Sequence, residues 1–128
     1  MRIEHVAIWT HNIDRLCAFY ATLFKAGIGE LYQNPRSDFG SRFVTFGHDA
    51  RIEIMSRPDV ADTPDQAIAH QGYAHLAISL GSSKAVDAMF ARAGELGIPV
   101  VSVPRTTGDG YYEAVVLDPD CNRIELVA

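Results

Sequence analysis

The chain has 128 residues, of which 48% are apolar and 21% are charged, and its formal net charge is −5. This length and composition fit one ordinary globular domain with a real core and argue against disorder. No basic run is present, so we expect neither a nucleic acid nor an anionic membrane as partner. Without a transmembrane-length apolar run or a signal-peptide pattern, and with Cys17 and Cys121 far apart in the sequence, we expect a cytoplasmic protein with reduced thiols.

The first half of the chain predicts a strand, a helix and three further strands. A strand over 3–9 is followed by a helix over 13–26, whose apolar residues recur at spacings of three and four and which Gly27 ends. Strands follow at about 28–32, 41–46 and 51–55, with a loop over 33–40. Residues 58–72, rich in proline and aspartate, are a linker in which a helical turn around 66–69 is one option.

The second half repeats this order. It predicts a strand over 73–80, a helix from the Ser82-Ser83 cap to Leu96, a strand over 98–103, and a hairpin of 111–117 and 122–127. A shift of 70 residues aligns His5 with His75, and a shift of 72 aligns Arg51-Ile52-Glu53 with Arg123-Ile124-Glu125. We therefore predict a single α+β domain over 1–128, built from two βαβββ modules at about 1–57 and 73–128, with a curved mixed sheet and the helices outside.

Four of these strands carry one metal-type ligand each. Side chains alternate between the two faces of a strand, and one face collects only aliphatic residues, which are Val6, Ile8, Ile52, Ile54, Leu76, Ile78, Ile124 and Leu126. The other face collects His5, Glu53, His75 and Glu125. Close together, these groups would desolvate and repel one another unless a divalent cation compensated them, so the set predicts a metal site. The alternative is that each glutamate is the ion-pair partner of the arginine two positions before it.

Two imidazoles and two carboxylates suit a borderline divalent ion with open positions, and Ni²⁺, Co²⁺, Mn²⁺, Fe²⁺ and Zn²⁺ are all compatible with them. A substrate with adjacent oxygens can chelate such an ion, which would polarise a carbonyl and stabilise an enediolate. A carboxylate can then take the carbon-bound proton. The expected reaction is proton abstraction next to a carbonyl, followed by an isomerase- or lyase-type rearrangement.

The paired modules resemble the vicinal oxygen chelate (VOC) superfamily, which includes glyoxalase I, extradiol dioxygenases, fosfomycin-resistance proteins, bleomycin-binding proteins and methylmalonyl-CoA epimerase. The resemblance spans nearly the whole chain and includes the opening His5 strand, Gly72-Tyr73-Ala74-His75, and Asp118-Pro119-Asp120 before Arg123-Ile124-Glu125-Leu126. It implies the glyoxalase/bleomycin resistance/dioxygenase fold, in which the sheet curves around a metal cavity.

Within this superfamily the His-Glu-His-Glu set is similar to that of glyoxalase I. The short linker resembles that of the bacterial glyoxalases that favour Ni²⁺ or Co²⁺. On this resemblance, Glu125 is the main base and Glu53 returns the proton. Glyoxalase I-like, metal-dependent lyase activity, with lactoylglutathione formation as one form, is therefore the first hypothesis.

Residues that hold glutathione in the short glyoxalases differ here. Trp9 replaces an Arg, Arg57 replaces an Asn, residues 106–110 replace a Lys-Gly-Gly-like loop, and Cys121 replaces a Gly. The resemblance therefore implies the same metal ligands, but it does not identify the substrate or whether glutathione or another thiol is part of it. A VOC-family thiol-transferase or hydrolase acting on a small electrophile or antibiotic, and a non-catalytic small-molecule binding protein, both stay open.

Five further residues are candidates for binding the substrate: Trp9, Phe46, Met55, Arg57 and Glu113. The first three are equally compatible with the core, and Glu113 with an exposed strand position, depending on the hairpin register. His11, His48 and His70 fall in predicted cap, turn and linker positions, where solvated side chains are expected. Because one module cannot close a cavity alone, the two halves must pair, within one chain or between two. The resemblance to the superfamily, and the pattern shared by the strands of His5 and His75, lead us to predict a homodimer, with each site built within one chain or shared between two.

Overall fold

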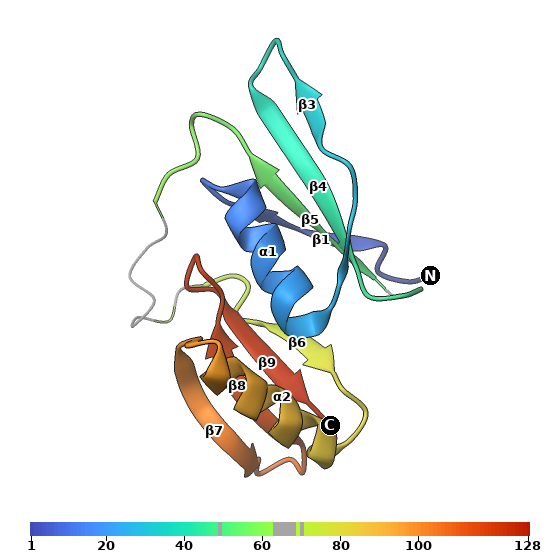
Figure 1. The fold of residues 1–128 in the computed structure, drawn as a ribbon, viewed down its shortest axis with the longest axis vertical. Helices are drawn as coiled ribbons and strands as arrows, with labels where there is room; N and C mark the ends of the chain where they lie inside the picture. Colours follow the sequence, from blue (N-terminus) through green and yellow to red (C-terminus); the bar gives the residue numbers. More distant parts are fainter. Residues whose placement is uncertain (49, 63–68, 70) are drawn as a thin grey trace. The chain divides into compact units, whose positions relative to one another are not determined.

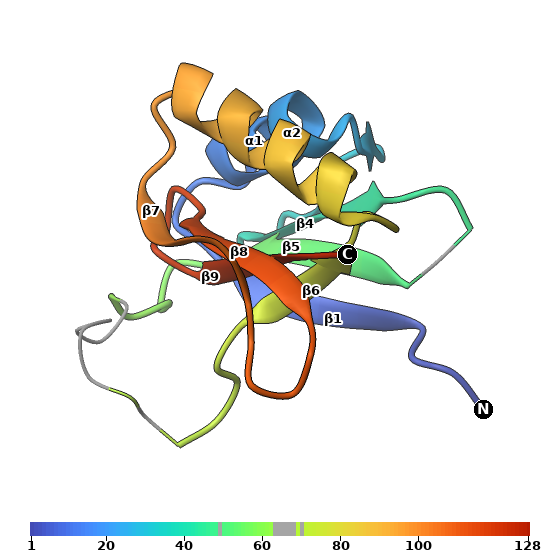
Figure 2. The same cartoon turned by 90° about the horizontal axis from the view of Figure 1, so that it is seen from below.

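The computed structural model describes residues 1–48, 50–62, 69 and 71–128. The chain divides into two compact units, Met1–Asp62 and Thr63–Ala128. In each unit one helix packs on one face of the unit's own sheet (Figure 1, Figure 2). The helical turn considered around 66–69 falls almost wholly outside the described residues.

The first unit is a mixed sheet with one helix. Its elements are β1 (His5–Trp9), α1 (Ile13–Phe24), β2 (Gly27–Ile28), β3 (Tyr32–Asn34), β4 (Phe39–Thr45) and β5 (Arg51–Ser56). The strand order is β1-β5-β4-β2, and β3 also pairs with β4. Strands β1 and β5 run parallel, whereas β2, β3 and β5 are antiparallel to β4.

The second strand of this unit is split, which the sequence pattern missed. Ile28 pairs with Val44 while Tyr32 pairs with Ser41, so the segment between them has one residue more than its partner strand. Such an extra residue is a bulge and bends the strand. Arg42 donates from Nη1 to the carbonyl oxygen of Gly29 at 3.0 Å, so the interrupted ladder is bridged by a side chain.

Helix α1 begins as predicted but ends earlier. The Asn12 side chain accepts a hydrogen bond from the backbone N–H of Arg15, as an N-cap does. Lys25 takes the left-handed conformation (φ 55°) that ends the helix, two residues before the glycine expected to do so. Gly27 instead belongs to β2, where a Cβ atom would lie 2.7 Å from Oγ1 of Thr45. Close approach of β2 and β4, rather than helix termination, therefore requires this glycine.

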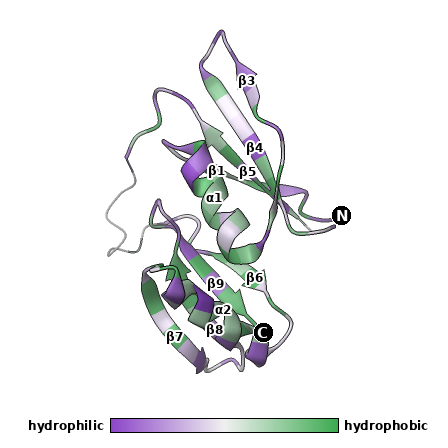
Figure 3. Cartoon of the chain, viewed as in Figure 1, coloured by the Kyte–Doolittle hydropathy of each residue, from purple (hydrophilic) through white to green (hydrophobic). Residues whose placement is uncertain are grey.

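The second unit has the predicted βαβββ order. Its elements are β6 (Leu76–Ser79), α2 (Ser83–Glu95), β7 (Val100–Thr106), β8 (Tyr112–Leu117) and β9 (Arg123–Val127). The strand order is β6-β9-β8-β7, with β6 and β9 parallel and the other pairs antiparallel. Ser82 caps α2 as predicted, and Gly97 follows its end at φ 68°. Figure 3 shows hydrophilic and hydrophobic residues along β9, as expected for a strand with one buried face.

Each unit buries the aliphatic face of its sheet under its helix. Fully buried residues in the two units include Leu16, Tyr20, Val44, Ile54, Val86, Val116, Ile124 and Leu126. Val6 and Ile8 of β1, and Leu76 and Ile78 of β6, are only half-buried because these strands form the edges of their sheets. The predicted α+β fold with two related modules is confirmed.

Helices of 12 and 13 residues are too short to span a bilayer. Across the described ranges, no helix has the length and apolar character of a membrane span.

Candidate metal centre

The first candidate pair, His5 and Glu53, lies on the sheet face of the first unit that α1 does not cover. In the parallel ladder Ala7 is opposite Glu53, so His5, two residues earlier, shares its face. His5 Nε2 lies 3.7 Å from Glu53 Oε2. Phe43 of β4 is opposite Glu53, and its ring meets the His5 ring edge to face at 5.6 Å between centroids.

The second candidate pair, His75 and Glu125, has the same arrangement in the second unit. Ala77 is opposite Glu125, and His75 immediately precedes β6. The distance from His75 Nε2 to Glu125 Oε2 is 3.3 Å. Both glutamates are largely shielded, with 19% and 17% of their side chains exposed, whereas the two histidines are 39% and 43% exposed.

The donor atoms of each pair fit one metal ion. With metal–ligand bonds of about 2.1 Å, neighbouring ligand atoms lie about 3.0 Å apart at a right angle and about 3.4 Å apart at the tetrahedral angle. The observed 3.3 and 3.7 Å are close to these separations. Within the described parts of the chain, no group of three or more His, Cys, Asp or Glu side chains is arranged to hold a metal. Each unit thus carries two candidate ligands.

Glu113 lies beside the second pair. It is 8% exposed, and the β8–β9 register puts it diagonally from Glu125 on the same face. The carboxyl of Glu113 is one of the groups that act on the pKa of Glu125, and Arg105 donates from Nη2 to Oε1 of Glu113 at 3.1 Å. Burial is the main cause that raises the pKa of Glu125; His75 opposes the rise and Glu113 adds to it. Glu125 therefore holds a proton more readily than an exposed glutamate does.

An aromatic patch with a cation lies on the same face as the first pair. Trp9 is 42% exposed and is opposite Met55, while Phe39 meets the Trp9 ring edge to face at 6.3 Å. The guanidinium of Arg57 lies 4.7 Å from the centre of the Trp9 ring, within the range of a cation–π interaction, and its Nε pairs with Asp59 at 2.8 Å. Four residues along an extended chain place Arg57 about 13 Å from Glu53.

Phe46 lies elsewhere. Its ring contacts the rings of Tyr20 and Phe24, both of α1, with 6.2 Å between centroids in each case. It therefore packs on the helix side of the sheet, and we leave it out of the proposed substrate site.

Exposed His11 pairs with Asp62 at 3.2 Å, and His48 is exposed in a turn.

His70 lies outside the described residues.

Three residues near the two pairs were not found from the sequence: Glu4, Phe43 and Arg105. Arg51 pairs with Glu4 rather than with Glu53, so the ion pair considered for Arg51 is formed with another carboxylate. Phe43 and Arg105 come from strands whose register depends on turns and a bulge, which no local pattern specified. A capping or charge motif would not have identified them.

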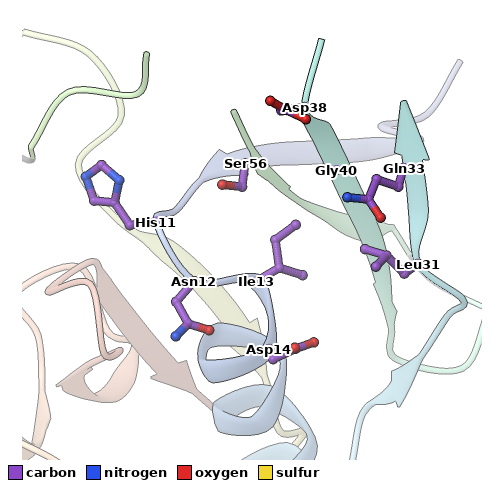
Figure 4. A pocket seen from close by; sticks show the side chains of 9 residues that line it. All are labelled: His11, Asn12, Ile13, Asp14, Leu31, Gln33, Asp38, Gly40 and Ser56. Atoms are coloured by element: carbon purple, nitrogen blue, oxygen red, sulfur yellow. The ribbon is translucent and has the colours of Figure 1, made fainter. Parts of the chain in front are cut away.

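A polar pocket of about 300 Å³ lies in the first unit, at the start of α1 (Figure 4). Its lining residues are His11, Asn12, Ile13, Asp14, Leu31, Gln33, Asp38, Gly40 and Ser56. Gly40 and Ser56 are register partners, and a Cβ on Gly40 would meet Cδ1 of Ile13, so this pocket opens on the helix side of the sheet. None of the four candidate ligands lines it.

The fold, with one His–Glu pair in each of two related modules, defines a protein of the vicinal oxygen chelate type. The chain matches the Glyoxalase/Bleomycin resistance protein/Dioxygenase superfamily over residues 2–126, and it belongs to that superfamily.

Solved structures of glyoxalases are similar to this chain at low sequence identity. Glyoxalase I from Zea mays superposes with a TM-score of 0.80 at 20% identity, over 98% of this chain and 44% of the maize chain, so this chain spans less than half of that enzyme. The trypanothione-dependent glyoxalase I of Leishmania major gives 0.78 at 22% identity, over 99% of this chain and 86% of that one. A glyoxalase family protein from Enterococcus faecalis gives 0.81 at 23% identity, over 99% and 97%. These likenesses establish the fold, and no curated protein matched the sequence.

Proposed function

We propose that this protein is a metal-dependent lyase or isomerase of the glyoxalase I type, which removes a proton next to a carbonyl of a small substrate. The observation that carries the proposal is the repeated His–Glu pair, with donor atoms 3.7 and 3.3 Å apart on the helix-free face of each sheet. Neither pair alone completes a site. The proposed site therefore uses His5, Glu53, His75 and Glu125 together, in an assembly of two modules.

The ligand set suits Ni²⁺ or Co²⁺, with Zn²⁺, Mn²⁺ and Fe²⁺ as further options. When bound, such an ion polarises a coordinated carbonyl and makes the neighbouring C–H bond more acidic. In this proposal Glu125 would take the carbon-bound proton and pass it to the oxygen on the neighbouring carbon, while Glu53 would take the hydroxyl proton of the first carbon and return a proton to the neighbouring carbon, so that both carboxylates regain their starting states. The surroundings of Glu125 are compatible with a role as the first base, because its shielded position and the carboxyl of Glu113 both raise its pKa.

For the substrate, we propose a small oxygen-bearing molecule, free or as an adduct of glutathione or another thiol. Trp9, Met55 and Arg57 would contact its outer part, since they share the face of His5 and offer aromatic surface and a positive charge. Trp9 stands where the short glyoxalases resembled by this chain carry an Arg that helps to hold glutathione, so this position does not favour glutathione as the thiol. A glyoxalase I of this fold that is described as trypanothione-dependent supports testing other thiols beside glutathione.

The metal site is tested by elemental analysis. Purified protein loaded with Ni²⁺, Co²⁺ or Zn²⁺ should hold about one divalent ion per chain, and His5→Ala or His75→Ala should lose it. His48→Ala, which changes an exposed turn histidine, is the matched control and should keep the ion. Full metal content in the His5→Ala/His75→Ala double variant would remove the basis of the proposal.

The activity is tested with methylglyoxal and glutathione, by following formation of the thioester product with each metal added in turn. Turnover that Glu125→Gln abolishes supports the proposal. Absence of turnover with glutathione, in protein shown to be loaded with metal, directs the same assay to other thiols. If no thiol and no α-oxoaldehyde is converted, the lyase proposal is wrong, and the thiol-transferase, hydrolase and non-catalytic binding hypotheses take its place.

A further inference from the structure

His5 is the better supported of the two histidines, because three groups surround its ring. Nδ1 of His5 contacts the carboxylate of Glu4, while Nε2 is directed at Glu53. The ring of Phe43 meets the imidazole edge to face, with an interplanar angle of 88°. A flexible, 39% exposed side chain is thereby given one orientation.

Glu4 is itself held in place. Its carboxylate accepts a hydrogen bond from Nη2 of Arg51, and its backbone carbonyl accepts one from the backbone N–H of Arg51 at 3.1 Å. The guanidinium of Arg51 lies 4.0 Å from the centre of the Phe43 ring. Glu4, Arg51 and Phe43 therefore form a closed set of contacts around His5, and all of them lie within the first unit.

This arrangement has a chemical consequence for the imidazole. An ionised carboxylate only accepts hydrogen bonds, so it selects the neutral tautomer in which Nδ1 carries the proton. The lone pair is then on Nε2, the nitrogen that faces Glu53. The same carboxylate accepts a hydrogen bond from the guanidinium of Arg51, a group that only donates, so both neighbours of Glu4 meet it as an acceptor. Metal-ligating histidines in proteins are commonly oriented in this way by a second carboxylate.

In the second module, the described positions equivalent to two of these supports carry different residues. The position equivalent to Glu4 is Ala74, and the residue opposite Glu125 is Val115 where the first module has Phe43 opposite Glu53. Its buried carboxylate, Glu113, lies diagonally from Glu125 on the same face of the sheet. The two halves of the proposed site are therefore not equivalent.

We propose that Glu4 is a positioning residue that presents Nε2 of His5 to the metal, and that no residue in the described part of the second module does the same for His75. This inference rests on the metal-dependent function proposed above. It predicts that removing the Glu4 carboxylate weakens metal binding about 10–100-fold, the range seen when a second carboxylate behind a ligating histidine is removed.

The test combines two measurements on the full chain. Metal affinity is obtained by competition of a chromophoric chelator for Co²⁺ or Zn²⁺, with Glu4→Ala, the near-isosteric Glu4→Gln, and the exposed Glu30→Ala as control. The tautomers of His5 and His75 are read in the metal-free protein from long-range ¹H–¹⁵N correlations, at a pH where both rings are neutral. Urea unfolding at one fixed protein concentration is recorded for each variant, so that a loss of metal affinity can be separated from a loss of fold.

We expect the wild-type His5 ring to carry its proton on Nδ1, and Glu4→Ala to lose that preference while His75 is unaffected. Glu4→Gln, which keeps an acceptor without the charge, should fall between the wild type and Glu4→Ala in affinity. Unchanged affinity in Glu4→Ala, or a wild-type His5 proton on Nε2, overturns the proposal. If the wild-type chain binds no divalent ion, the proposed function fails together with the ligand role of His5. A His5 proton found on Nδ1 in that case would show that Glu4 still orients the imidazole, and that the error lies in the proposed metal site.

Discussion

Asp118 holds the β8–β9 turn, and its removal should measurably destabilise the hairpin that carries Glu113 and Glu125. This carboxylate is 3% exposed and accepts three hydrogen bonds, each 2.9 Å long. Two reach Oδ1, from the backbone N–H groups of Asp120 and Asn122, and one reaches Oδ2, from the side chain of Asn122. At about 1 kcal/mol net for each bond, Asp118→Ala should lower the free energy of unfolding by about 3 kcal/mol.

Asp118→Asn should lower the free energy of unfolding by less than Asp118→Ala does. The asparagine keeps one oxygen for the two backbone donors but places an NH₂ group where Asn122 donates, so it should cost about 1 kcal/mol. Urea unfolding followed by circular dichroism at one fixed protein concentration measures both variants, with the exposed Glu95→Ala as control. An Asp118→Ala variant within about 0.5 kcal/mol of the wild type, or an asparagine variant as unstable as the alanine variant, would refute this account of the turn.

Three further predictions concern pH, the aromatic patch and assembly. Burial raises the pKa of Asp118, so the folded chain holds this proton more tightly than the unfolded chain does. The wild type should therefore gain stability relative to Asp118→Asn as the pH falls from the folded pKa to the ordinary aspartate value of about 3.9. A stability difference that is flat or opposite in sign over this pH range would contradict the prediction. Trp9 is the only tryptophan, so Arg57→Ala, which uncovers the indole, should increase the quenching of its fluorescence by acrylamide, whereas Arg105→Ala should not. Light scattering should report about twice the chain mass. Mixing the His5→Ala chain with the Glu125→Gln chain should restore some metal binding and turnover if the halves of a site come from different chains. If mixing restores nothing, each site lies within one chain.

The sequence by itself determined the repeat, the class of fold and the four candidate ligands. Period-two alternation separates Ile52 and Ile54 from Glu53, because neighbouring side chains of a strand point to opposite faces whatever the strand pairs with. The same argument holds for Glu125 in the second half, and a shift of 70 residues relates the two histidines without any knowledge of structure. Ser82 as the cap of α2 also followed from local chemistry alone.

Only the tertiary structure decided which other residues accompany the ligands. Phe43 lies beside His5 because the pairing of β4 with β5 puts it opposite Glu53, whereas Phe46, beyond the end of β4, packs on Tyr20 and Phe24 of α1. Arg51 meets Glu4 across the start of two strands that are far apart in the sequence, so no local pattern could reveal their ion pair. Glu113 joins Glu125 for the same reason: the register of a hairpin is set by its turn and its bulges, and a slip of one residue would send the side chain to the opposite face of the sheet.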